Sequence, residues 1–195
     1  MIGAGTGLGQ GMLIWDKDHY SPVATEGGHA NFAPVDELQL ELARYLIKTH
    51  GRTSWELLLS GHGLVELYAF LKARGEIPES PAVAKAMQAN DPAAAVTQAA
   101  LERNDPLASQ ALDLFIDIYG AQAGNLALTA GATGGVYVAG GIAPKIISRI
   151  TDGGFMRAFR SKGNMSHYVA AIPVLVVTNL QVGLIGATLA ATRMK

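Results

Sequence analysis

The chain of 195 residues contains no cysteine, which excludes disulfide bonds, thiolate metal sites and cysteine nucleophiles. It also lacks an excess of either charge, because 15 basic residues face 16 acidic ones for a net charge of −1. This balance argues against an electrostatic surface for nucleic acid or for an anionic membrane. Only 16% of the residues are charged and 49% are hydrophobic, which is typical of a folded domain with a large core.

Long uninterrupted apolar runs are also missing. Residues 120–144 and 163–192 contain no Asp, Glu, Lys or Arg, but glycine pairs, Asn, Gln, Thr or Pro interrupt both stretches. A membrane-spanning helix needs about 20 predominantly apolar residues in one piece, so we expect no membrane segment. Met1 leads directly into a glycine-rich stretch without the basic start and apolar run of a signal peptide. We therefore expect a cytoplasmic protein.

Glycine is abundant, and the first glycine cluster opens the chain. Residues 3–9 carry glycine at every second position. The cluster satisfies neither the dinucleotide-binding fingerprint nor the P-loop pattern. Alternating glycines can still leave backbone N–H groups free to bind an anion, and Thr6 adds a hydroxyl donor. The sequence therefore leaves two interpretations open, a phosphate-binding loop and a tight turn that opens a hairpin.

A second glycine cluster surrounds the short apolar run at residues 136–139. Gly134 and Gly135 precede this run, and Gly140 and Gly141 follow it. Glycines at the ends of a strand can let a flat ligand approach the backbone. They can equally serve only to let a helix pack closely on the sheet, and the residues alone favour that simpler interpretation.

The order of the predicted elements indicates the fold class. Two strand-like runs at residues 11–15 and 20–25 are joined by a predicted hairpin turn at 16–18. Helices follow, with predicted N-caps at Asp36, Ser54, Asp91 and Asp105, and Ser54 is expected to start a short helix through Leu59. Strands at 136–139 and 174–177 then alternate with helices from Pro144 and at 180–193. A hairpin followed by this alternation predicts a mixed sheet covered by helices.

Three polar residues are candidates for a binding site. Glu26 and His29 are three apart across two glycines, so both can point into one cleft, and Glu56 follows later. Carboxylates accept hydrogen bonds from hydroxyl groups, and histidine can donate or accept. The alternative is that Glu26 and His29 are simply solvated and that Glu56 is a charge on a helix surface. The other four histidines show no metal-binding spacing.

Four segments, in this order, resemble the bacterial glucokinase family of the hexokinase–actin–heat-shock ATPase superfamily. They are Gly3–Gly9 (GAGTGLG), Glu26–Pro34 (EGGHANFAP), Glu56–Leu64 (ELLLSGHGL) and Gly135–Pro144. Together they are spread over most of the chain. Two departures are visible, because Asn31 replaces a common Asp and His62 stands where Pro is frequent. Neither residue is assigned to the site.

The resemblance implies a ribonuclease-H-like (actin-like ATPase) α/β domain, with a mixed sheet and helices on both faces. It implies ATP-dependent phosphorylation of the 6-hydroxyl of glucose, with ATP and Mg²⁺ as cofactors, in a homodimeric protein. By resemblance, the phosphate loop contains Gly5, Thr6 and Gly7, and the adenosine loop contains Gly140 and Gly141. The glucose ligands would be Glu26, His29 and Glu56. No residue of this chain is expected to bind a metal.

The same resemblance indicates what this chain does not contain. Members of the family carry an N-terminal domain with an Asp-x-Gly-Gly-Thr loop and an Asn-Asp pair whose Asp is the general base. The Asn-Asp pairs here, at 90–91 and 104–105, lie downstream of the phosphate loop, where the catalytic pair should lie upstream. Only Met1 and Ile2 precede the loop, too few for a usual strand of about 5–6 residues.

We therefore expect residues 1–195 to form a single C-terminal (large) domain, with the N-terminal domain and most of the first strand missing. This domain would lack the catalytic base and would be inactive alone. The final helix, at 180–193, would pack on the missing domain. Two alternatives remain: a sugar-responsive regulator of the related repressor–kinase group and a kinase for another hexose. The regulator would need a helix-turn-helix, and many such proteins use a cysteine-rich zinc site that a chain without cysteine cannot form.

Overall fold

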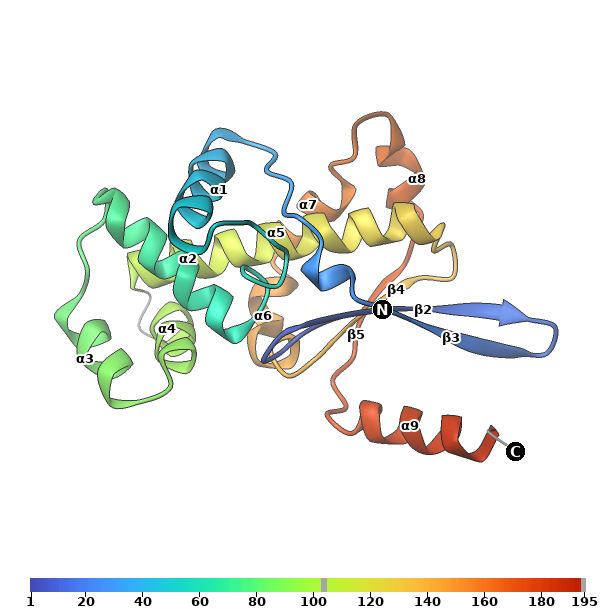
Figure 1. Ribbon diagram of the computed structural model, residues 1–195. Helices are drawn as coiled ribbons and strands as arrows, with labels where there is room; N and C mark the ends of the chain where they lie inside the picture. The colour runs from blue at the N-terminus through green and yellow to red at the C-terminus, as the bar shows by residue number, and fades with distance from the viewer. Residues whose placement is uncertain (103–104, 194–195) are drawn as a thin grey trace.

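The computed structural model describes residues 1–102 and 105–193. Asn104, half of the second Asn-Asp pair, lies outside the described residues. Figure 1 shows the long helix α5 (Pro106–Ala130) crossing the middle of the molecule above the sheet, and the last helix, α9 (Val182–Arg193), below it. The hairpin of β2 (Leu8–Asp16) and β3 (His19–Thr25) projects away from the helices.

The five strands of the described residues form one mixed sheet in the order β3-β2-β1-β4-β5. Strand β1 (Ile2–Ala4) is antiparallel to β2 and parallel to β4 (Val136–Ala139), which is parallel to β5 (Val174–Val176). The predicted mixed sheet is thus confirmed. Because parallel strands end at the same edge, the segments after β1, β4 and β5 lie along one edge of the sheet. In open α/β sheets this edge is where ligands bind.

One face of the sheet carries the core. Ile2 and Ala4 of β1 and Val138 of β4 are fully buried, on the face where α5 packs. The opposite face carries Tyr137 and Leu175, which are exposed. Helix α9 lies on that side in Figure 1.

The remaining helices surround α5 and are mostly short. They are α1 (Glu37–His50), α2 (Gly61–Arg74), α3 (Pro81–Ala89), α4 (Pro92–Leu101), α6 (Ile147–Ile150), α7 (Gly154–Arg160) and α8 (Ser166–Ala170). The described residues also contain three 3₁₀ turns: Gly27–His29 after β3, Ala143–Ile146 after β4 and Gly163–Met165 between α7 and α8. Three predicted caps are confirmed: the carboxylates of Asp36, Asp91 and Asp105 accept hydrogen bonds from backbone N–H groups in the first turns of α1, α4 and α5.

The short helix predicted after Ser54 is wrong. Residues 55–59 form a single turn, in which the Ser54 hydroxyl accepts the N–H of Leu57 at 3.3 Å, as predicted for a cap. The N–H groups of Trp55 and Glu56 donate to the carbonyls of Ala30 and Gly28, at 3.0 and 2.9 Å. These distant partners hold the segment against the 3₁₀ turn at Gly27–His29. Helix α2 begins only at Gly61, where the Ser60 hydroxyl accepts the N–H of Gly63 at 3.0 Å.

The first glycine cluster is mostly strand. Gly3 and Ala4 belong to β1, and Leu8 and Gly9 begin β2, so only Gly5–Gly7 form the connecting turn. The sequence interpretation placed all of residues 3–9 in a loop. The backbone alternates instead, with Ile2 and Ala4 buried on the core face and Gly3 on the other.

Tyr119 of α5 holds β1 and β4 together directly behind the two glycine turns. Its hydroxyl accepts the N–H of Ala4 at 3.1 Å and lies 3.5 and 3.4 Å from the carbonyl oxygens of Ile2 and Ala139. The ring is fully buried, and burial raises the pKa of this hydroxyl well above its usual range. This contact fixes the spacing of the two strands where they enter the turns.

Candidate functional site

The turn at Gly5–Gly7 has one internal hydrogen bond and one backbone hydrogen bond to the start of α2. The Gly5 N–H donates to the Gly7 carbonyl at 2.8 Å, and the Gly5 carbonyl accepts the N–H of Gly61 at 2.9 Å. The Gly5 N–H is therefore already used. Within the described ranges no protein group accepts a hydrogen bond from the N–H of Thr6 or Gly7. These two donors and the exposed Thr6 hydroxyl are available to an anion.

The structure gives a packing reason for one of the two glycines after β4 and not for the other. Gly140 has a φ of 85°, and a Cβ there would collide with the Ala4 carbonyl oxygen. Its identity is therefore fixed by the turn and by the close approach of β1. No atom lies within 4 Å of the position of a Cβ at Gly141. Close packing thus explains Gly140, while Gly141 borders open space beside the first turn.

The three polar candidates lie together. His29 Nε2 is 4.0 Å from Glu26 Oε2, and its Nδ1 is 3.6 Å from Glu56 Oε1. The 3₁₀ turn at Gly27–His29 and the turn at 55–59 position them, through the bond from Glu56 N–H to the Gly28 carbonyl. The Glu56 side chain is 33% exposed, against 92% for Glu26. Glu56 is thus the more rigidly placed carboxylate of the pair.

Glu56 also contacts the glycine turn, which the sequence interpretation did not foresee. Its Oε2 accepts the N–H of Leu8 at 2.9 Å. A Cβ at Gly7 would lie 2.5 Å from the same oxygen, so a side chain at position 7 would displace the carboxylate. The polar cluster and the turn therefore form one continuous site.

A hollow of about 330 Å³ adjoins this cluster. It is lined by His29, His50, Arg52, Ser54, Glu56 and Leu57. Arg52 donates to the His29 carbonyl at 2.9 Å, and His50 Nε2 lies 3.1 Å from Glu66 Oε2. The sequence interpretation assigned no role to His50 or Arg52. They reach the site because α1 ends at His50, with Gly51 as its C-cap, shortly before the turn at 55–59, and no local spacing signals this.

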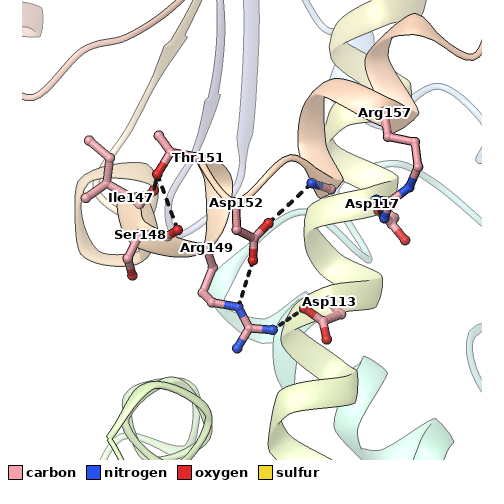
Figure 2. A network of polar contacts seen from close by, with 9 residues as sticks. Asp113, Asp117, Ile147, Ser148, Arg149, Thr151, Asp152 and Arg157 are labelled. Carbon is pink, nitrogen blue, oxygen red and sulfur yellow. Dashed lines mark hydrogen bonds and ion pairs between the residues drawn. The ribbon is translucent and has the colours of Figure 1, made fainter.

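A larger hollow, of about 410 Å³, lies elsewhere and has a different character. Figure 2 shows its charged lining, which comes from α5, α6, α7 and the loop between the last two. Arg149 pairs with Asp113 and Asp152, and Arg157 Nη2 lies 3.4 Å from Asp117 Oδ1. Each of these side chains has an ion-pair partner within the network, which therefore connects the helices without needing a ligand.

No three His, Asp or Glu side chains in the described part of the chain are arranged to bind a metal ion. No helix among the described residues combines the length and the apolar character needed to cross a membrane.

The chain was compared with known proteins. The family model described as "Glucokinase" matches residues 1–194. The chain is 48% identical to the glucokinase of Nostoc sp., in an alignment that covers 100% of this chain and 60% of that protein. A crystal structure of glucokinase from an Antarctic psychrotroph superposes with a TM-score of 0.83 at 32% identity, covering 98% of this chain and 57% of the other.

A more distant structure shares the fold alone. The ROK family glucokinase from Streptomyces griseus, crystallised with glucose and AMPPNP, gives a TM-score of 0.64 at 22% identity, covering 98% of this chain and 59% of that one. Both superpositions confirm the predicted actin-like α/β fold. The chain spans about 60% of the length of the curated relatives that it matches.

Proposed function

Since this chain belongs to the glucokinase family, we propose that the whole protein transfers a phosphoryl group from ATP to the 6-hydroxyl of glucose. One structural observation supports the proposal in addition to family membership. A single carboxylate, that of Glu56, joins a cluster suited to sugar hydroxyls to a glycine turn suited to phosphate. Phosphoryl transfer depends mainly on positioning its two substrates, and adjacent subsites provide this.

The sugar subsite would consist of Glu26, His29 and Glu56. Two carboxylates and an imidazole can accept and donate hydrogen bonds with several neighbouring hydroxyls. His29 lies between the two carboxylates, with its ring nitrogens 4.0 and 3.6 Å from their oxygens. These distances leave the three groups close together without tight mutual pairing, so hydroxyl groups can enter between them.

The nucleotide subsite would follow the edge where β1 and β4 end. We infer that the N–H groups of Thr6 and Gly7, with the Thr6 hydroxyl, bind the ATP phosphates. Gly141, with Gly140 beside it, would face the adenosine. The Gly5 N–H is not among the proposed donors, because it is bonded to the Gly7 carbonyl at 2.8 Å. The described residues offer no metal-binding cluster, so Mg²⁺ would arrive with the ATP phosphates.

We infer that residues 1–195 act as the large C-terminal domain and are inactive alone. The catalytic base would lie on the N-terminal domain of the whole protein. Asp91 belongs to the first of the two Asn-Asp pairs. Its carboxylate caps α4 by accepting the N–H of Ala93 at 2.9 Å. It is thus already engaged in the fold. A base that accepts the sugar proton typically contributes about 10²–10⁴-fold in rate, so its absence would prevent useful turnover.

Two exposed apolar surfaces bear on how the whole protein assembles. Leu184, Ile185 and Leu189 of α9 are all more than half exposed. We propose that they pack against the N-terminal domain. The β2–β3 hairpin presents Trp15 and Tyr20, which stack edge to face with ring centroids 4.9 Å apart and are also exposed. We propose this hairpin as part of the contact in a homodimer, since large exposed apolar patches mark association surfaces.

The proposal is tested on the whole protein and on residues 1–195 side by side. A coupled assay with ATP should show glucose phosphorylation by the whole protein, and calorimetry should show glucose binding without turnover by residues 1–195. Mannose, fructose and N-acetylglucosamine, assayed in parallel, decide whether another hexose is preferred. Binding without turnover by the whole protein would favour the regulator.

A pair of histidine variants locates the sugar subsite. His29→Ala should weaken glucose binding by about tenfold or more, because the proposed hydrogen bond from the imidazole to a sugar hydroxyl is lost. His167→Ala, an exposed histidine of α8, is the matched control and should bind like the unmodified protein. Equal binding by both variants, or turnover by residues 1–195 alone, would contradict the proposal.

A further inference from the structure

Glu56 contacts two segments that the proposed function assigns to different substrates. Its Oε1 faces His29 Nδ1 at 3.6 Å, and its Oε2 accepts the N–H of Leu8 at 2.9 Å. Leu8 is the first residue after the glycine turn. One carboxylate is therefore shared between the sugar cluster and the turn. A carboxylate that accepts a backbone N–H makes a charge-assisted hydrogen bond, which holds the backbone more firmly than a neutral one.

The same short segment holds the other end of the turn. The Gly61 N–H donates to the Gly5 carbonyl at 2.9 Å, and the Ser60 hydroxyl donates to the Glu56 carbonyl, also at 2.9 Å. The turn at Gly5–Gly7 is thus fixed from one side by the Glu56 side chain and from the other by the start of α2. Both contacts come from residues 56–61, so a shift of this segment would move both ends of the turn.

The two outer glycines of the turn differ in what a side chain would meet. At Gly7 a Cβ would lie 2.5 Å from Glu56 Oε2 and 3.2 Å from its Cδ. At Gly5 no atom lies within 4 Å of the corresponding position. Neither residue has the positive φ that disfavours alanine. A side chain at position 7 is therefore incompatible with the observed position of the Glu56 carboxylate.

We propose that Glu56 is a positioning residue for the phosphate turn and that it couples the sugar subsite to this turn. The coupling rests on the proposed function, whereas the positioning role rests on geometry alone. A sugar hydroxyl that binds Glu56 would alter the carboxylate's hold on the Leu8 N–H, and a change in the turn would alter the carboxylate that the sugar meets. Such linkage is reciprocal, so each ligand would change the affinity of the other by the same factor.

Two alanine variants of the turn test the coupling in residues 1–195. Gly7→Ala should displace the Glu56 carboxylate and weaken glucose binding by about tenfold in calorimetry. Glu56 is the proposed sugar ligand through which a change at position 7 would act. Gly5→Ala adds the same methyl group in open space and should leave glucose affinity within about twofold. Thermal unfolding of both variants establishes that they remain folded. Equal glucose affinity in the two variants would overturn the coupling.

The positioning role is tested without any ligand, by hydrogen exchange of the Leu8 amide. Glu56→Ala should accelerate this exchange, and Glu56→Gln should largely preserve protection, because its amide oxygen can still accept the bond. Exchange at Leu8 that is unchanged in Glu56→Ala would refute the positioning role, even if Gly7→Ala fails to fold. If unmodified residues 1–195 bind no glucose, the proposed sugar subsite fails in this chain and the coupling fails with it, whereas the exchange experiment still decides the positioning role.

Discussion

Helices α5 and α9 are both mostly apolar and each contains two glycines, yet they lie in opposite environments. Most of α5 is buried, and its glycines let α7 approach: a Cβ at Gly120 would collide with the Phe155 carbonyl, and one at Gly124 with the Phe159 carbonyl. In α9 no atom lies within 4 Å of either corresponding position. Figure 1 shows α9 standing apart from the rest of the molecule.

This contrast shows what composition alone decides and what it does not. A helix that is apolar around its circumference belongs in a core or against another apolar surface. Helix α5 has that surface within the described chain, in α7, α2 and the sheet. Helix α9 does not, so its composition supports the proposal that the rest of the whole protein covers it. Substitutions that compare the two helices therefore test that proposal.

The largest expected difference comes from adding one methyl group to each helix. Gly120→Ala should destabilise the fold by about 3 kcal/mol, because the new Cβ meets backbone that cannot move independently. Gly186→Ala should instead stabilise by up to about 1 kcal/mol, since alanine favours a helix and nothing obstructs it. Urea unfolding of both variants measures the difference. A loss of similar size in both would mean that α9 is as closely packed as α5.

Tyr119→Phe tests how much α5 contributes directly behind the site. The variant leaves the buried N–H of Ala4 without its 3.1 Å partner, which should cost about 1–3 kcal/mol in urea unfolding. Tyr137→Phe is the matched control, because that ring is exposed on β4, and it should change stability by less than about 0.5 kcal/mol. If Tyr119→Phe behaves like its control, the hydroxyl does not hold β1 and β4 together.

The exposed face of α9 should promote self-association of residues 1–195. Leu184→Glu should weaken this association by about tenfold or more, because burying a leucine contributes about 1.5–3 kcal/mol. Sedimentation measures the effect, with Gln88→Glu on the exposed side of α3 as the control that adds the same single negative charge. A monomer at high concentration for the unmodified chain would contradict the prediction. So would equal dissociation of both variants.

The parts of the fold that the sequence predicted correctly rest on local signals. Asp36, Asp91 and Asp105 were identified as caps because the partner N–H groups lie two or three residues away. The hairpin followed from two strand-like runs and from the turn predicted between them. The strand at 136–139 was apparent from the glycines that surround it. Each of these signals predicts one element from nearby residues, so the prediction does not depend on tertiary contacts.

The features that the sequence missed rest on distant contacts. The segment after Ser54 makes one turn and not a helix, and its contacts with Gly28 and Ala30 could not be predicted from local spacing. The Glu56–Leu8 bond joins residues 48 apart, and no spacing rule predicts it. The resemblance named Glu56 without this second contact, since a family motif identifies residue types and not every partner. The candidate site could therefore be identified from the sequence, but its internal connection could not.

The smallest expected effect concerns the polar side of α5, which faces the network in Figure 2. Burial raises the pKa of Asp117, an effect that Arg157 opposes and that nearby acids, Asp113 among them, reinforce. An acid whose pKa is raised on folding adds stability below its ordinary value of 3.8, and this contribution is lost as pH rises through the raised value. At neutral pH, Asp117→Asn should therefore be as stable as the unmodified chain or slightly more so, by less than about 1 kcal/mol because the side chain is 39% exposed.

Urea unfolding at neutral pH and near the ordinary pKa of aspartate measures this effect. The unmodified chain should gain stability relative to Asp117→Asn as the pH falls through that interval, since its carboxyl becomes protonated in the folded state first. Arg157→Ala should enlarge the gain, because it removes the cation that opposes the shift. A clear loss of stability in Asp117→Asn at neutral pH would show instead that the Arg157 pair outweighs burial. The polar side of α5 would then hold α7 through charge, as its apolar side does through close packing.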